Sequence, residues 1–163
     1  MEVFEAIRTL LAVRQYQDRP VPESVLNSIL EAGRLSASAM NKQPWHFVIV
    51  QDQKTLRQLG EMVRTGPYIA EAPLAIVVVV ERTRFAASDA SRAIQDMMLA
   101  AWGEGVGSNW VGFGGLEEVN ALLGIPNNLD VFAIVPFGYP AEPIGAGEKD
   151  RLPLSDIVHW ERW

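Results

Sequence analysis

The chain contains no cysteine among its 163 residues. This absence excludes disulfides, thiolate nucleophiles, iron–sulfur clusters and cysteine-based zinc sites, so redox chemistry would have to come from a bound cofactor. Histidine is almost as scarce. The two histidines, His46 and His159, are far apart in sequence and have no carboxylate cluster at metal-ligand spacing beside them. The residues therefore predict no metal site.

The chain also has no excess of positive charge and no long apolar run. The formal net charge is -6 and the pI is near 4.9, whereas a general nucleic-acid binder needs a basic face to displace counterions from phosphates. The longest apolar run, residues 72–80, contains a proline and has about half the length of a membrane-spanning helix. The N-terminus, Met1–Glu5, is acidic where a secretory signal would be basic. These features predict a cytoplasmic protein.

The pattern of apolar residues predicts alternating helices and strands in one domain spanning residues 1–163. Residues 74–80 are so continuously apolar and β-branched that both faces should be covered, which places this strand at the centre of a sheet. Ser88 is the expected N-cap of a long buried helix, and Pro136 is expected at a strand end or on an edge strand. The expected helices lie near residues 3–11, 22–30, 54–64, 88–104 and 116–123, and the expected strands near 46–50, 74–80, 105–115 and 131–137.

Small and amide side chains gather where the second helix crosses to the first strand, at residues 36–45. Ser38, Asn41 and Gln43 both donate and accept hydrogen bonds, which suits a flat ligand rich in carbonyl groups, ring nitrogens and hydroxyls. None of the three is an obvious acid, base or nucleophile. Ser, Asn and Pro are also ordinary turn residues, so the residues alone leave a structural role equally open.

Three further features have a functional and a structural interpretation. Five glycines within residues 105–115 would let a planar ligand approach the backbone, although close packing of a helix on the sheet explains them as well. They form neither a Rossmann fingerprint nor a P-loop. Lys149 and Arg151 would clamp a phosphate, or would be solvated surface charges. Asp89 and Asp96, seven residues apart on the long helix, are interpreted as solvated charges.

Seven segments, in order along nearly the whole chain, resemble the nitroreductase-like family of flavin-dependent oxidoreductases. The most specific of them is the Ser-Ala-x-Asn-x-Gln-Pro-Trp portion, which begins at Ser38. The seven segments are Arg14–Tyr16, Pro20–Pro22, Ile29–Arg34, Ser36–Trp45, Ala72–Pro73, Gly105–Gly112 and Gly138–Pro140.

The resemblance implies an α+β fold with a central sheet flanked by helices, in an intertwined homodimer that binds FMN at the subunit interface. Residues 139–163 would form a C-terminal arm packed on the partner subunit, which would bury Trp160 and Trp163. The implied activity is the reduction of nitroaromatic, quinone or related acceptors with NAD(P)H, by ping-pong hydride transfer through flavin N5. No side chain has a catalytic role in that scheme, because the flavin supplies the chemistry.

The resemblance also implies the residues that hold the flavin. Arg14 would lie at the pyrimidine edge of the ring, and Gly112 would present its backbone N–H near flavin N5. The full set is Arg14, Ser38, Asn41, Gln43, Trp110, Val111, Gly112 and Phe113 around the ring, with Lys149 and Arg151 at the phosphate.

One departure from the family concerns the phosphate. The family usually carries Arg-Arg-Ser just before the position of Val13, where this chain has Leu10, Leu11 and Ala12. The loss of two charged donors and a hydroxyl leaves an alternative open, a homodimeric binding protein of the same fold with weakened or lost FMN binding. A third alternative, an acidic scaffold acting through its surface, has only the composition behind it.

Overall fold

The computed structural model describes residues 1–112, 116–144 and 149–163. Its centre is a four-stranded antiparallel sheet with strand order β1-β2-β4-β3. The strands are β1 (Trp45–Val50), β2 (Leu74–Glu81), β3 (Gly107–Ser108) and β4 (Leu129–Gly138). The α-helices are α1 (Val3–Thr9), α2 (Glu23–Leu35), α3 (Gln53–Met62), α4 (Ala86–Gly103), α5 (Leu116–Leu123) and α6 (Leu154–Ile157), and the short 3-10 helices are η1 (Ala39–Asn41) and η2 (Pro67–Glu71).

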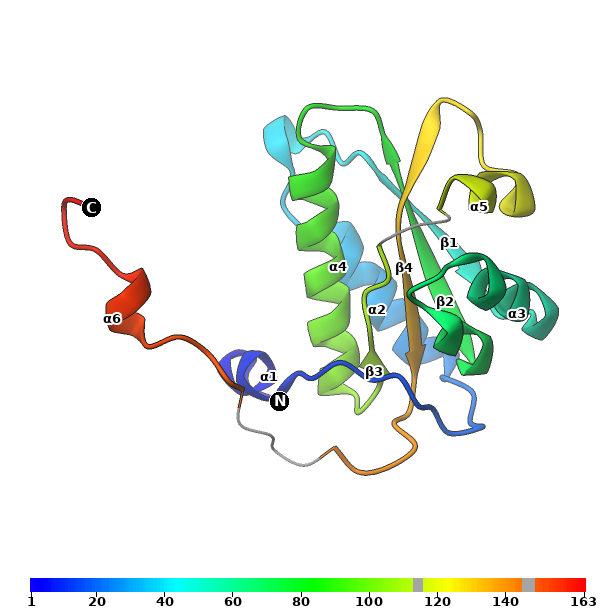
Figure 1. Cartoon of the computed structure of the whole chain (residues 1–163), viewed down its shortest axis with the longest axis horizontal. Coiled ribbons are helices and arrows are strands. Elements are labelled where there is room, and N and C mark those ends of the chain that lie inside the picture. Colours follow the sequence, from blue (N-terminus) through cyan, green and yellow to red (C-terminus); the bar gives the residue numbers. More distant parts are fainter. Residues whose placement is uncertain (113–115, 145–148) are drawn as a thin grey trace.

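Helices cover both faces of the sheet, with α2 and α4 on one face and α3 and α5 on the other (Figure 1). Strand β2 alternates between two cores because successive side chains of a strand point to opposite faces. Leu74, Ile76 and Val78 face α2 and α4, while Ala75 and Val77 face α3 and α5. The predicted central position of this strand and the predicted α+β architecture are confirmed.

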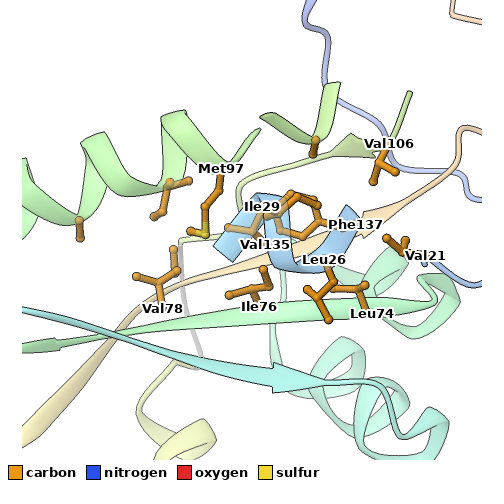
Figure 2. Packing of buried hydrophobic residues seen from close by; sticks show 14 of the residues in the cluster. Val21, Leu26, Ile29, Leu74, Ile76, Val78, Met97, Val106, Val135 and Phe137 are labelled. Atoms are coloured by element: carbon orange, nitrogen blue, oxygen red, sulfur yellow. The ribbon is translucent and has the colours of Figure 1, made fainter. Parts of the chain in front are cut away.

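The core beneath α2 and α4 is made of interlocking aliphatic side chains around one aromatic ring (Figure 2). Phe137 from β4 is fully buried there beside Ile29 of α2 and Met97 of α4. Gly33 lets α2 approach α4, since a Cβ at this position would lie 2.9 Å from Cγ of Met97. This close crossing fixes the helix that leads into residues 36–45.

A small change in this core has a measurable expected effect. Ile76 has no solvent exposure, so Ile76→Val removes a methylene group without room for the neighbours to relax fully. The free energy of unfolding should fall by about 0.5–1.5 kcal/mol, measured by urea titration. Ile49→Val on the half-buried edge strand is the matched control, and an equal loss there would contradict the central packing of β2.

Three local expectations were wrong. Helix α1 ends at Thr9 because Val13 donates to the carbonyl of Ser108 at 2.9 Å, which draws the following residues into an extended pairing. Ser88 lies inside α4 and donates to the Phe85 carbonyl, so it is not the cap. Pro136 lies in β4, an interior strand between β2 and β3. Strand β3 pairs with β4 only at Phe137 and Gly138, so Pro136 has no pairing residue on β3.

Two segments with apolar side chains extend from this body, α1 and the C-terminal arm that carries α6 (Figure 1). Phe4 on α1 is 76% exposed, and Trp163 at the end of the arm is fully exposed. The large apolar side chains exposed on these two segments are Met1, Val3, Phe4, Ile7, Leu152, Leu154, Ile157, Val158, Trp160 and Trp163. Among the described helices, none has both the length and the apolar character needed to cross a membrane.

Candidate functional site

Residues 36–44, here called the amide loop, adopt a backbone that few side chains tolerate. Met40, Asn41 and Gln43 have φ angles of 52°, 54° and 49°, all in the left-handed region that disfavours L-residues other than Gly, Asn and Asp. The Ser38 hydroxyl accepts from the Gln43 backbone N–H at 2.9 Å, and Gln43 Nε2 donates to Asn41 Oδ1 at 3.2 Å. Asn41 and Gln43 are exposed. The loop thus uses Ser38 to brace itself and presents two carboxamides at the surface.

The amide loop is tied to α4 by two carboxylates, so the interpretation of Asp89 and Asp96 as solvated charges was wrong. Asp89 is 1% exposed, and its Oδ1 accepts from the Ala39 N–H at 3.1 Å. Asp96 Oδ2 accepts from the Ser36 hydroxyl at 2.5 Å. These contacts span 50 and 60 residues of sequence, so helical spacing alone could not reveal them.

A second group of polar residues surrounds Arg14. Its guanidinium carbon lies 5.9 Å from the centre of the Tyr68 ring, and the side-chain amide of Asn109 donates to the Tyr68 hydroxyl. Arg14 also borders a depression of about 340 Å³ between residues 12–15 and 140–144. The sequence analysis missed Tyr68 and Asn109, because neither belongs to a motif that marks it.

The segment after β3 runs beside β4 and contains the residues predicted to contact the flavin ring. Val111 is 1% exposed and exchanges two hydrogen bonds with Ile134, at 2.9 and 2.8 Å, so its own backbone groups are engaged in the sheet. Trp110 is partly exposed, with its ring edge-on to Phe132 at 5.7 Å between centroids. A Cβ at Gly112 would lie 2.6 Å from Nε1 of Trp110, so a larger residue here would have to displace the Trp110 ring. Phe113 lies outside the described residues.

Lys149 and Arg151 lie beside α1. The Lys149 ammonium donates to the carbonyl of Ile7 at 2.5 Å, near the C-terminal end of that helix, where a cation is favourable. Partial burial, assisted by the charge of Arg151, lowers the pKa of Lys149. Arg151 donates to the carbonyl of Asp150. Lys149 therefore lies against the helix that precedes Leu10, with Arg151 close enough to act on its charge.

The amide loop and the predicted phosphate-binding cation Lys149 lie at opposite ends of α4. The amide loop contacts Asp89 in the first turn, whereas Trp102 in the last turn donates to Thr9 of α1 at 2.9 Å. Eighteen helical residues span about 27 Å at 1.5 Å per residue. A single chain therefore does not bring the amide loop together with the cations beside α1.

A separate open groove of about 940 Å³ runs between α2 and the edge strand β1. It contains His46, which lies 3.7 Å from Glu81, but none of the ten predicted flavin contacts. Its lining residues are Asn27, Ser28, Leu30, Glu31, Arg34, Trp45, His46, Phe47 and Ile49. Within residues 1–112, 116–144 and 149–163, no three His, Cys, Asp or Glu side chains gather as a metal site.

Comparison with known proteins identifies the family. The nitroreductase family model matches residues 8–81 and 66–139. The whole chain is 36% identical to a Methanothermobacter thermautotrophicus protein, covering 88% of it, that is provisionally named NADH dehydrogenase/NAD(P)H nitroreductase. The FMN reductase (NAD(P)H) of Bacillus subtilis is 25% identical over 99% of this chain and 74% of its own length.

The structural comparison gives the same result. An FMN-dependent nitroreductase from Clostridium difficile superposes with a TM-score of 0.86 at 26% identity, covering 98% of this chain and 99% of that one. The chain belongs to the nitroreductase family, and it is an oxidoreductase.

Proposed function

We propose that the chain is an FMN-dependent oxidoreductase that uses NAD(P)H to reduce nitroaromatic, quinone or related acceptors. The names of its relatives support both the flavin and the nicotinamide. The observation that carries the proposal is the amide loop, whose left-handed backbone presents the carboxamides of Asn41 and Gln43 together. A carboxamide both donates and accepts, and so matches the alternating carbonyls and ring nitrogens of a flavin edge.

The proposed active form is a homodimer with FMN at the interface. Support comes from the separation of the amide loop from Lys149 by the length of α4, because a second copy would have to complete each site. The apolar side chains exposed on α1 and the C-terminal arm give this second copy a surface to cover. Residues 139–163 would then pack on the partner subunit.

The polar, apolar and charged groups of the predicted site residues match the chemical groups of FMN. Asn41 and Gln43, braced by Ser38, would hydrogen-bond one edge of the ring, and Trp110 would contribute apolar surface. The exposed guanidinium of Arg14 would lie at the pyrimidine edge, where negative charge develops on reduction. When bound, FMN would supply ping-pong hydride chemistry between NAD(P)H and the acceptor. Lys149 and Arg151 would supply the positive charge for the phosphate.

The visible spectrum and an FMN titration test this function. The purified protein should show flavin bands near unit stoichiometry, or gain them with added FMN. Asn41→Ala combined with Gln43→Ala should weaken FMN binding about 10- to 100-fold, since each lost hydrogen bond contributes about 0.5–1.5 kcal/mol. Lys42→Ala, an exposed change between the two, is the matched control. A colourless protein that gains no bands with FMN would contradict the proposal.

A second candidate is a homodimeric binding protein of the same fold with weakened or lost FMN binding. Leu10 and Leu11 offer a phosphate no polar side-chain group, and Lys149 already donates to the Ile7 carbonyl. This candidate predicts a dimer that binds FMN only weakly. Submicromolar affinity in the unaltered protein would rule it out.

A further inference from the structure

The carboxylate of Asp89 is buried in a way that demands an explanation. Its exposure is 1%, and its Oδ2 has no hydrogen-bond partner among the described residues. Burying a carboxylate with one oxygen unpaired costs free energy, so the hydrogen bonds of the other oxygen must offset part of that cost. Oδ1 accepts from the Ala39 N–H at 3.1 Å and lies 3.4 Å from Nη1 of Arg92 and from the Ser88 hydroxyl. The Ala39 contact is the one that reaches outside α4.

Ala39 is the first residue of the strained part of the amide loop. Directly after it, Met40 and Asn41 take positive φ angles, and Gln43 does so two residues later. Left-handed conformations of residues other than glycine persist only where surrounding contacts enforce them. Some of these contacts are internal to the loop, such as the bonds that Asn41 N–H and Lys42 N–H donate, each at 3.1 Å, to the carbonyls of Ser38 and Ala39. The hydrogen bond to Asp89 fixes this unit to the rigid helix.

We propose that Asp89 is a positioning residue, which holds the amide loop in the conformation that presents Asn41 and Gln43 to the flavin. The inference rests on the proposed function for the identity of the ligand. It does not rest on it for the loop, since the hydrogen bond joins two groups of this chain. Asp89 itself is buried beneath the loop and acts only through the backbone of Ala39.

Two variants delete the same hydrogen bond from opposite sides. Asp89→Ala removes the acceptor, and Ala39→Pro removes the donor without altering α4. Proline is compatible with the first position of η1, because Ser38 before it is extended, with φ -132° and ψ 157°. Asp89→Asn is the conservative variant, since a carboxamide oxygen accepts from the same N–H. Met97→Ala is the control, a buried change on the same helix that leaves both partners of the Asp89–Ala39 hydrogen bond in place.

Amide hydrogen exchange of residues 36–44 and FMN titration are the two measurements. Asp89→Ala and Ala39→Pro should each speed exchange in the loop and raise the Kd for FMN at least about tenfold, whereas Asp89→Asn should restore most of both. Met97→Ala should lower the melting temperature without selective exchange in the loop.

The outcomes separate the inference from the proposed function. Unchanged loop exchange in both deletion variants, or an unchanged Kd for FMN with faster exchange, would overturn the positioning role. A failure of Asp89→Asn to restore either property would overturn it too. If the unaltered protein binds no FMN, the proposed function fails and the flavin part of the inference fails with it, while loop exchange still decides whether Asp89 holds the loop.

Discussion

Replacing Leu10, Leu11 and Ala12 by Arg, Arg and Ser is expected to tighten FMN binding about 100- to 10,000-fold. Two new charge-assisted hydrogen bonds to a phosphate contribute about 1.5–3 kcal/mol each. The three positions lie between the end of α1 and the pairing of Ala12 with Ser108, in the same region as Lys149. FMN titration followed by fluorescence gives the affinities.

The matched control for this change carries Gln, Gln and Ser at the same three positions. It loses the same leucine side chains but adds no charge, so it should gain about tenfold at most. The Arg-Arg-Ser variant should also lose affinity with rising salt more steeply than the control, because its gain is electrostatic. Equal affinities of the two variants would show that the phosphate lies elsewhere.

Ending the chain at Arg151 is expected to convert the proposed dimer into a monomer and to weaken FMN binding by at least about 100-fold. The deletion removes the exposed apolar side chains of the arm, including Trp160 and Trp163. It retains Lys149 and Arg151, so the lost affinity would come from the missing second copy. Sedimentation equilibrium measures the dimer, and a titration under the same conditions measures FMN binding.

The complementary variant separates assembly from phosphate binding. Lys149→Ala with Arg151→Ala keeps the arm, so it should remain a dimer while its affinity for FMN falls. A shortened chain that stays a dimer with unchanged affinity would show that the arm does not complete the site. A shortened chain that stays a dimer but loses FMN would assign the arm a direct contact.

Most of the fold could be predicted because its pattern is local. The uninterrupted apolar run at residues 74–80 predicted a strand covered on both faces, and the helix expected at residues 116–123 is α5, followed by Gly124 with a φ of 66°. The apolar pattern on either side placed the amide loop correctly between helix and strand. Its flavin contacts remain predictions, since they concern a ligand and a second copy.

Two of the errors share one physical cause, which is contact between distant parts of the chain. Leu10 and Leu11 continue the helical spacing of α1, but pairing with Ser108 stops the helix first. Asp89 has the sequence context of a surface charge, yet it is buried and bonded to Ala39, 50 residues away. Periodicity carries no information about such partners, so neither the helix end nor the loop anchor could be derived from it.

The two-sided burial of β2 also bears on how the chain behaves before it is folded. Residues 74–80 form a seven-residue apolar segment of high β-propensity without charge, which is the type of segment that pairs with copies of itself. Pro73 before it and Glu81 after it interrupt such pairing at both ends. Refolding at high protein concentration should therefore lose yield to aggregation, and substitution of either flanking residue by valine should increase that loss.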